Sequence, residues 1–290
     1  MKNSIKKASI LLEALPYLQK FRRKTFVIKL GGSTMEDNAI VKSVLNNAVF
    51  LENTGIRIII VHGGGKAITQ AMNRAGIKSK FIEGLRVTDS KTIKIVENVL
   101  VNKINADLVK KINDLGGKAV GISAADHGVL EVNKQYAYKE ENNKKKRIDI
   151  GYVGRITTIY THPIYRLLNV DKIPVIAPLG LGPHGFVHNI NADTAACEIA
   201  GKLKAEKLIF ISDVDGIFHG KRLISSLTIK DVETHIKKGI IRDGMVPKSK
   251  SMIKALKKGV KKTHIINGNI PHSLLLEIYT DKGIGTELIK

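Results

Sequence analysis

The chain is built from short apolar runs, most of which are followed by a turn or by a stretch with helical periodicity. The runs are nearly continuous, without the polar alternation of a half-exposed strand. Such runs are typical of strands buried on both faces of a parallel sheet, with helices as the connections. We therefore predict an α/β protein with a mainly parallel sheet. The runs span residues 25–30, 56–61, 118–123, 174–180, 207–212 and 263–268, with a shorter one at 185–191.

The intervening segments predict helices and two hairpins. A glycine-centred pattern at 81–88 indicates a short hairpin about Glu83-Gly84, and residues 129–159 indicate a β-ribbon with an exposed lysine-rich loop at 141–147. Helices are predicted over about 37–53, from the second glycine turn through about Ala75, over 89–114 and over about 272–280, with two more that follow Asn189–Asp193 and begin at Gly244–Lys248.

An amphipathic helix is predicted over residues 5–20, before the first strand. Pro16 is expected to end or kink it near Leu15. A transit peptide is the alternative, but the segment is poor in Ser and Arg and runs into the fold with almost no linker. We interpret residues 1–23 as an N-terminal extension whose apolar face needs a partner, since the core is expected to begin at Thr25. That face consists of Ala8, Leu11, Leu12 and Leu15.

Two of the apolar runs end in glycine turns that suit an anion. Lys29 lies at the carboxyl end of the first run, before Gly31-Gly32, and the second run ends in His62-Gly63-Gly64-Gly65. A buried lysine is costly without an anion, while glycines let backbone amides approach one closely and the next helix adds its positive end. The turns predict a phosphate site in one crevice; the alternative is an ordinary turn whose lysine reaches water. Neither turn matches a Walker A loop or a GxGxxG fingerprint.

Further side chains are candidates for the same crevice. Arg86 follows the predicted hairpin turn and could bind a carboxylate with two hydrogen bonds, although a surface ion pair is the commoner role of an arginine. Asn189, Asn191 and Asp193 precede or begin a helix that either Asn191 or Asp193 could cap; asparagines can also bind substrate, and the aspartate can orient lysines. Lys248 follows Pro247 in the first turn of another helix, which is also a favourable place to meet phosphate.

Composition narrows the function classes. The chain has 290 residues, 43% of them hydrophobic, and no apolar run approaches the roughly 18 residues of a membrane span. A single cysteine, Cys197, excludes an internal disulfide and a cysteine metal cage and fits a reducing compartment. The net charge of +22 could indicate nucleic-acid binding, but the lysines are scattered, aromatics are 5% and Trp is absent. We favour solvated lysines that attract anionic substrates, with no nucleic-acid or membrane partner.

Taken together and in order, five motifs resemble the amino acid kinase family. They are Lys29–Gly32, His62–Gly65, Gly84–Thr88, Asn189–Asp193 and Gly244–Lys248. The resemblance covers residues 15–290 and is greatest to members that phosphorylate N-acetyl-L-glutamate in arginine biosynthesis. It implies an αβα sandwich on a mainly parallel eight-stranded sheet. It also implies a lobe over 24–190 for the amino acid and for dimerisation, and a lobe over 191–290 for ATP.

The resemblance also implies roles for individual residues. Lys29 and Lys248 would neutralise the transferring phosphoryl group, with Asp193 holding both lysines. Mg²⁺ would travel on the ATP phosphates, without protein side chains as ligands. The amides of Gly32, Gly64 and Gly65 would bind the transferring oxygens. Substrate would be bound by Gly64, Gly65, Arg86, Asn189 and Asn191, and nucleotide by Lys29, Ser212, Asp213, Gly216 and Lys248.

The arginine-sensitive branch of the family has an N-terminal helix like residues 1–23, which interlaces dimers into a hexamer, a trimer of dimers. The resemblance implies that arginine would bind between this helix and the C-terminal tail and inhibit the enzyme. The departure at Asn267-Gly268-Asn269, where Asp-Gly-Arg is common, bears on its affinity. The implied arginine residues are Tyr17, Lys207, His264, Glu277 and Gly285.

Two further implications concern partners and compartment. Members from cyanobacteria and plastids bind the signalling protein PII, and a Lys- and Asn-rich chain would suit a plastid-encoded gene, so a cytoplasmic or plastid stromal location is expected. Aspartate kinase, glutamate 5-kinase, UMP kinase and carbamate kinase fit the motifs less well. A non-catalytic arginine sensor or a basic nucleic-acid binder is the alternative of another class, which the intact Lys29, Asp193 and Lys248 disfavour.

Overall fold

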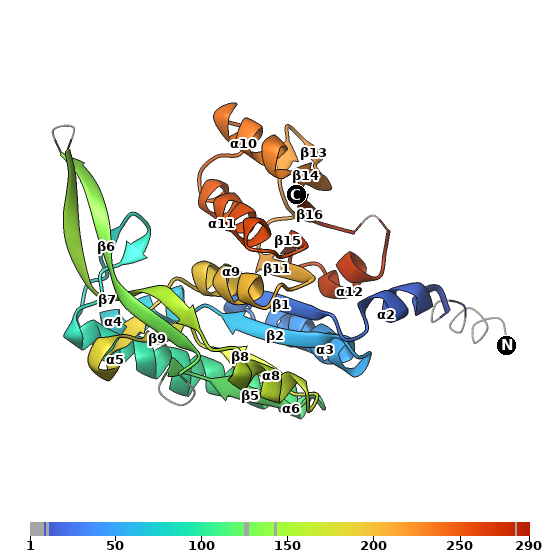
Figure 1. Ribbon diagram of the computed structural model, residues 1–290, viewed down its shortest axis with the longest axis horizontal. Helices are drawn as coiled ribbons and strands as arrows, with labels where there is room; N and C mark the ends of the chain where they lie inside the picture. The colour runs from blue at the N-terminus through green and yellow to red at the C-terminus, as the bar shows by residue number, and fades with distance from the viewer. Residues whose placement is uncertain (1–8, 10–11, 125–127, 142–143, 282) are drawn as a thin grey trace.

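Eight strands form one continuous sheet in the computed structural model, which describes residues 9, 12–124, 128–141, 144–281 and 283–290 (Figure 1). Every neighbouring pair is parallel except β15–β16, so the predicted mainly parallel, eight-stranded sheet is confirmed. The spatial order is β14 (Ser226–Thr228), β16 (Thr286–Ile289), β15 (Lys262–Asn267), β11 (Lys207–Ser212), β1 (Thr25–Leu30), β2 (Arg57–His62), β8 (Ile173–Ile176), β5 (Ala119–Ile122).

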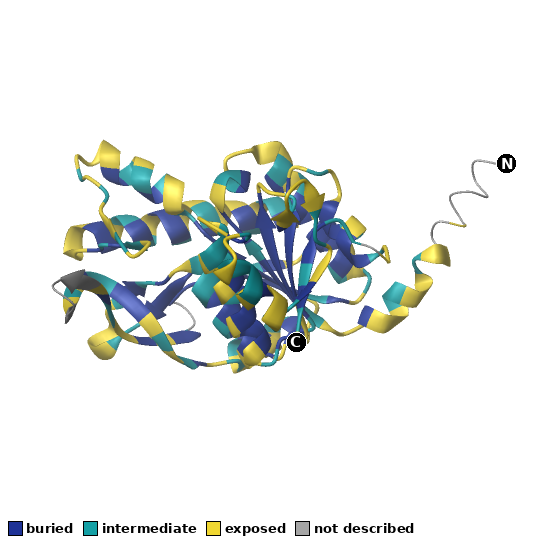
Figure 2. Ribbon diagram, turned by 90° about the horizontal axis from the view of Figure 1, so that it is seen from above, coloured by how far each residue is buried: buried dark blue, intermediate teal, exposed yellow. Residues whose placement is uncertain are grey.

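Helices cover both faces of this sheet, as the side views in Figures 1 and 2 show. Side chains alternate between two cores along each strand: Val27 lies in one core, and Phe26 and Ile28 lie in the other. The first core includes residues of α8 (His162–Leu168), α9 (Ala192–Lys202), α10 (Ile229–Lys237) and α11 (Met245–Lys257). The second includes residues of α3 (Asn38–Asn53), α6 (Ala106–Asp114) and α12 (Ser273–Ile278). This arrangement is the expected αβα sandwich.

The predicted helix over 89–114 is continuous, but it is not α-helical throughout. It runs as α5 (Ser90–Glu97), a π-helical segment η2 (Asn98–Asn105) and α6. The widened segment lies beside the second glycine turn and α4 (Gly65–Arg74), where Ile68, Leu100 and Met72 share a separate apolar cluster. π-Helical turns are rare and are frequent at functional sites.

The predicted β-ribbon is confirmed, but two boundaries were wrong. β6 (Leu130–Glu141) and β7 (Lys144–Ile159) pair along their length, so the lysines at 144–147 begin a strand and do not form a loop. The run at 174–180 breaks at Pro178, which has no amide to donate to a sheet. Its second half, β9 (Leu179–Leu181), joins β10 (Val187–Asn189) and the ribbon in a small closed barrel. Figure 1 shows the ribbon projecting away from the large sheet.

The N-terminal segment contributes to the core earlier than expected. α2 (Leu15–Phe21) has Pro16 in its first turn, and residues 12–13 before it are also helical, so the helix is interrupted at Ala14, as expected near Leu15, and continues beyond the proline. Phe21 is 5% exposed and packs edge-to-face on Phe26 with ring centroids 5.3 Å apart. The expectation that the core begins at Thr25 was therefore wrong. Ala8 and Leu11 of the predicted apolar face lie outside the described residues, while Leu12 is 68% exposed.

Two short hairpins complete the strands of the described fold: β3 (Phe81–Ile82) with β4 (Leu85–Arg86), as predicted around Glu83-Gly84, and β12 (Phe218–His219) with β13 (Arg222–Leu223). Within the part of the chain that the structure describes, no helix has the length and apolar character to cross a membrane.

Candidate active site

The two glycine turns lie against each other at the carboxyl ends of β1 and β2. The amide of Gly63 donates to the carbonyl of Leu30 over 2.7 Å. A Cβ atom built on Gly31 would lie 2.7 Å from the Nζ atom of Lys29, so glycine is what allows the lysine to lie over its own turn. Gly32 has φ +73°, a conformation that favours glycine. The sequence prediction that both turns face one crevice is confirmed by this contact.

The second turn passes directly into α4. Gly64 is the residue before the helix, and a Cβ atom on it would lie 2.6 Å from Leu100 Cδ2 and 2.8 Å from Ile104 Cδ1. The first amides of a helix have no partner within it, and here they include those of Gly65 and Lys66. This helix end therefore presents free donors and a positive dipole to the crevice, which is the arrangement that binds phosphate in proteins.

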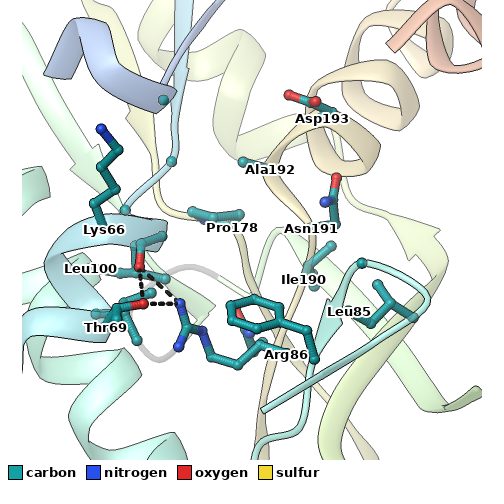
Figure 3. Close-up of a pocket in the computed structure, with 18 of the residues that line it drawn as sticks. Lys66, Thr69, Leu85, Arg86, Leu100, Pro178, Ile190, Asn191, Ala192 and Asp193 are labelled. Atoms are coloured by element: carbon teal, nitrogen blue, oxygen red, sulfur yellow. Dashed lines mark hydrogen bonds between the residues drawn. The ribbon is translucent and has the colours of Figure 1, made fainter. Parts of the chain in front are cut away.

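A cavity of about 570 Å³ opens in front of the turns (Figure 3). Figure 3 shows Lys66, Thr69 and Arg86 on one side of it and Asn191 and Asp193 on the other. The predicted residues that line it come from both turns, the hairpin, β10 and the start of α9: Lys29, Gly32, Gly64, Gly65, Arg86, Asn189, Asn191 and Asp193. The sequence thus identified the residues that converge here from segments more than 160 positions apart.

Lys29 forms the central ion pair of the cavity. Its Nζ atom lies 2.7 Å from Asp193 Oδ1, and the two side chains are 12% and 27% exposed. Asp193 is held in the first turn of α9, which Asn191 caps by accepting a hydrogen bond from the amide of Thr194 over 3.0 Å. The cap that the sequence left open between Asn191 and Asp193 is therefore Asn191, and Asp193 is free to pair with the lysine.

Lys248 approaches the same carboxylate from α11. Its Nζ atom donates to Ser212 Oγ over 2.8 Å. Burial lowers the pKa of Lys248, and the charge of Lys29 lowers it further. The charge of Asp193 raises the pKa of Lys248 and so opposes both effects. Lys248 does not line the large cavity, so it lies on the α11 side of Asp193, next to the turn that follows β11. The structure thus supports Asp193 as a shared neighbour of both lysines, with a direct ion pair to Lys29.

Arg86 is a buried cation that lines the cavity. It is 6% exposed, and its terminal nitrogens donate to Gly65 O, Thr69 Oγ1 and Ser79 Oγ over 2.7–2.8 Å (Figure 3). Its guanidinium carbon also lies 4.6 Å from the ring centre of Phe81. Burial lowers the pKa of the Arg86 guanidinium. Among the described residues no carboxylate lies within ion-pairing distance of it, so the surface ion pair considered from the sequence was wrong.

The predicted nucleotide residues lie on the other side of the ion pair, after β11. Ser33, from the first glycine turn, donates to Asp213 Oδ2 over 2.5 Å, a bond that lowers the pKa of Asp213. Gly216 has φ +148°, and a Cβ atom on it would lie 2.5 Å from Thr286 Oγ1. Gly216 also lines a second cavity of about 380 Å³, together with Phe218, Ile240 and Met245. The apolar members of that cavity carried no signal in the sequence that distinguished them from core residues.

The comparison with family models decides the classification. The model of the amino acid kinase family matches residues 24–267. The chain belongs to the amino acid kinase family. The match contains all five motifs, and the expected resemblance and kinase class are confirmed.

Full-length relatives of this family member are acetylglutamate kinases. One from Halothermothrix orenii is 47% identical over 294 residues, covering 100% of this chain and 99% of the relative. One from Aquifex aeolicus is 46% identical over 295 residues and covers 99% of both. Among solved structures, N-acetylglutamate synthase from Neisseria gonorrhoeae, complexed with coenzyme A and N-acetyl-glutamate, has a TM-score of 0.85 at 23% identity, over 98% of this chain and 63% of that one. Carbamate kinase from Giardia lamblia bound to citric acid has a TM-score of 0.63 at 14% identity, over 92% and 99%. Both structures share the amino acid kinase fold.

Sequence reasoning missed one ion pair of this kinase site. Lys66 Nζ lies 2.5 Å from Glu36 Oε2, and both residues line the large cavity. Each follows one of the glycine turns, so the pair joins the two turns across the cavity. Lys66 directly follows the second motif, but nothing in the sequence paired it with Glu36, 30 positions earlier.

The predicted arginine residues of this family member form a separate buried network. Lys207 Nζ lies 3.0 Å from His264 Nε2, and His264 Nδ1 lies 2.6 Å from Glu277 Oε1. Glu277 Oε2 accepts hydrogen bonds from the amides of Ile284 and Gly285 over 2.8 and 3.1 Å. Burial lowers the pKa of Lys207 to about 8. Burial alone would raise the pKa of Glu277, but its hydrogen bonds and the charge of His264 lower it overall.

Tyr17 joins this region through the C-terminal tail. Its hydroxyl donates to Asp281, and its ring packs edge-to-face on Tyr279 with centroids 6.2 Å apart. Lys207 lies over the ring of Phe21, in the same helix as Tyr17, with 5.6 Å to the centroid. The five predicted residues thus lie in one region. A direct chain of contacts joins Lys207, His264, Glu277 and Gly285.

Proposed function

We propose that the protein transfers the γ-phosphoryl group of ATP to the side-chain carboxylate of N-acetyl-L-glutamate, giving N-acetyl-L-glutamyl 5-phosphate in arginine biosynthesis. The relatives that carry this name match the whole chain, which supports the assignment. The observation that carries it is the cavity itself, where two glycine turns, the Lys29–Asp193 pair and a buried arginine without a carboxylate partner among the described residues face one space.

The amino acid would be held by its α-carboxylate. Arg86 would bind that group, since its burial leaves an uncompensated positive charge at the cavity wall. Asn189 and Asn191 also line the cavity and would bind the acetyl amide and the carboxylate. These contacts would leave the side-chain carboxylate pointing to the glycine turns. A carboxylate of this kind is ionised at pH 7, so no general base is required.

Phosphoryl transfer would then depend on positioning and charge. The amides of Gly32, Gly64 and Gly65 would bind the oxygens of the group in flight, as in an oxyanion hole. Lys29 and Lys248 would neutralise its charge from two sides, and Asp193 would keep both lysines in place. Ser212, Asp213 and Gly216 would contact the nucleotide.

The residues present fit a nucleotide that brings its own Mg²⁺. Among the described residues no group of three or more His, Cys, Asp or Glu side chains is placed to hold a metal ion. Bound on the phosphates, the ion would supply charge neutralisation between them. The lysines and amides of the chain would act on the remaining oxygens.

Hydroxylamine trapping of the acyl phosphate tests the reaction. With Mg-ATP, the full chain is expected to give signal with N-acetyl-L-glutamate and not with L-glutamate or L-aspartate, because the acetyl amide is part of what the asparagines would recognise. Coupled ADP release with UMP or carbamate serves as a further comparison. Equal signal with free glutamate, or turnover of carbamate alone, would reject the assignment.

We further propose that arginine inhibits the enzyme by binding at the network of Lys207, His264 and Glu277, between α2 and the C-terminal tail. Glu277 would exchange its bond to His264 for the guanidinium of the ligand. Residues 1–23 would link dimers into a hexamer. The exposed Leu12 and Leu15 support this role, since they present an apolar face that the chain itself does not cover.

Two deletions separate these roles. Removing residues 1–14 takes away Leu12 and leaves Phe21 in the core, whereas removing 1–23 also takes away this core residue. We expect the shorter deletion to convert hexamer to dimer and abolish arginine inhibition while catalysis persists. Light scattering and an arginine titration on both proteins measure this. A full-length protein that is dimeric and indifferent to millimolar arginine would refute the proposal.

Binding of PII in the cytoplasm or a plastid stroma is the remaining proposal from the family resemblance. It is tested by gel filtration of the two purified proteins with Mg-ATP. Co-elution is expected, and separate elution at micromolar concentrations of both proteins would exclude the complex.

A further inference from the structure

His62 is a buried histidine that the proposed reaction does not use. It is the last residue of β2, it is 0% exposed, and burial lowers the pKa of its ring to about 4. The ring is therefore neutral at pH 7. Its Nδ1 atom lies 3.0 Å from the carbonyl oxygen of Gly63, and its Nε2 atom lies 3.1 Å from Asn105 Nδ2. Both nitrogens of a group without access to water are thus engaged.

The partners of Asn105 fix which nitrogen of His62 carries the proton. Asn105 Nδ2 also lies 2.9 Å from the carbonyl oxygen of Val175, which can only accept a hydrogen bond. The atom that faces Val175 must therefore be the amide nitrogen, which donates its second hydrogen to His62 Nε2. His62 Nε2 then accepts, and Nδ1–H donates to the carbonyl of Gly63. Asn105 thereby selects the tautomer of the histidine.

The surrounding chain is shaped to keep Asn105 in this place. It is the last residue of the π-helical segment η2 and is 5% exposed. A Cβ atom on Gly121 of β5 would lie 2.2 Å from Asn105 Oδ1, so only glycine leaves room for the amide. Two other residues of the same segment, Leu100 and Ile104, fill the space that a Cβ atom on Gly64 would occupy. The segment thus contacts the glycine turn at two points.

The hydrogen bond between His62 and the carbonyl of Gly63 also sets the direction of the Gly64 amide. The carbonyl of Gly63 and the amide of Gly64 belong to one planar peptide unit and point in opposite directions. Glycines on both sides leave that plane free to rotate, since neither residue has a Cβ atom to restrict it. A hydrogen bond that holds the carbonyl therefore aims the amide.

We propose that Asn105 and His62 are positioning residues that orient the Gly63–Gly64 peptide, so that the Gly64 amide points at the transferring phosphoryl group. The inference rests on the proposed kinase function. Loss of the hydrogen bond from His62 to Gly63 is expected to lower kcat with little change in KM for either substrate. The Gly64 amide, a donor to the transition state, is then misdirected, while the groups that bind the substrates remain. We expect a loss of about 10- to 100-fold, below that for removing such a donor outright.

Two substitutions at His62 distinguish a role in orienting the Gly63–Gly64 peptide from a role in filling space. His62→Asn keeps a side-chain N–H close to the position of Nδ1 and is expected to retain kcat within about threefold of the wild type, whereas His62→Leu, of similar bulk, loses it. Asn102→Leu is the control, because Asn102 lies on the same π-helical segment but is exposed and bonds to Asn98 alone among the described residues. Steady-state kinetics for both substrates and thermal unfolding are measured on each variant. Equal kcat for the Asn and Leu variants would overturn the inference.

A measurement on the unmodified protein does not depend on how the variants fold. Nitrogen-15 NMR of histidine-labelled enzyme at pH 7 is expected to show His62 as the neutral Nδ1–H tautomer. An Nε2–H tautomer in the wild type would also refute the inference. Absence of wild-type turnover with N-acetyl-L-glutamate would instead refute the proposed function, whatever the tautomer.

Discussion

Lys29 and Lys207 lie on neighbouring strands of the sheet, but near opposite ends. In the register of β1 and β11, Lys29 pairs with Phe210 near the carboxyl end and Lys207 pairs with Phe26 near the amino end. Lys29 faces a cavity and, among the described residues, has one carboxylate partner, which is itself 27% exposed. Lys207 is 7% exposed and is joined to His264, which in turn bonds to Glu277.

The difference shows what prepares a lysine for a ligand. An ion pair at the wall of a cavity leaves part of the charge of Lys29 facing the open space, where an anion can share it. The network of Lys207 satisfies its members from within the chain, so a ligand must displace one of those bonds. The first arrangement suits catalysis at every turnover, and the second suits a site that responds only to a tightly matched effector.

The largest expected effect is at Lys29. Lys29→Ala removes a charge that would act mainly on the transition state, so kcat is expected to fall on the order of 100-fold or more. Lys110→Ala is the control, since Lys110 forms only a surface pair with Asp114 among the described residues and should leave kcat unchanged. Initial rates at saturating substrates measure the effect. Near-normal kcat in Lys29→Ala would remove the distinction drawn between the two lysines.

The next effect concerns substrate binding at the same cavity. Arg86→Ala is expected to raise KM for N-acetyl-L-glutamate roughly 30-fold or more, since truncating one partner of a buried charged pair costs about 2–5 kcal/mol. Arg74→Ala, at the exposed end of α4, is the matched control. KM for ATP should stay within about threefold. A larger change for ATP than for the amino acid would place Arg86 on the nucleotide side.

Glu277 tests the satisfied network through stability. Both of its carboxylate oxygens accept hydrogen bonds from buried donors, and Glu277→Gln leaves only one acceptor oxygen for them. We expect the free energy of unfolding to fall by about 1–3 kcal/mol, the cost of an unsatisfied buried group. Urea denaturation measures it, with the surface variant Glu233→Gln as control, expected to change by less than about 1 kcal/mol. Similar losses in the two variants would contradict the network.

The last effect is a dependence of stability on pH. The pKa of Lys207 is about 8 in the folded chain and 10.5 in the unfolded one, so between these values the unfolded chain binds more protons at this side chain. The free energy of unfolding therefore gains a contribution that rises from pH 8 to 10.5. Lys207→Met should lack this rise, and the difference between wild type and variant is followed by urea denaturation at several pH values. Parallel pH profiles would show that Lys207 is not held by burial.

The motifs allowed much of the candidate site to be predicted, because each consists of local chemistry that is visible in the chain. A lysine before paired glycines and an asparagine before a helix indicate an anion site and a cap without knowledge of the partner. Glu36 and Asn105 gave no such signal, because their roles depend on distant partners. Glu36 pairs with Lys66, 30 positions away, and Asn105 bonds to His62, 43 positions away. The fate of Arg86 was equally open, since burial and the lack of a carboxylate are properties of its surroundings.

The sequence by itself determined the order of strands and helices, the parallel sheet and the two glycine turns. Apolar periodicity and glycine act over a few residues, so these features do not depend on distant neighbours. Tertiary structure alone decided that Pro178 ends a strand of the large sheet, that Phe21 belongs to the core, and that residues 98–105 form a π-helical segment against the second turn. It also decided the contrasting environments of Lys29 and Lys207, because the charge and solvation of a lysine depend on groups that only the folded chain brings within a few ångströms.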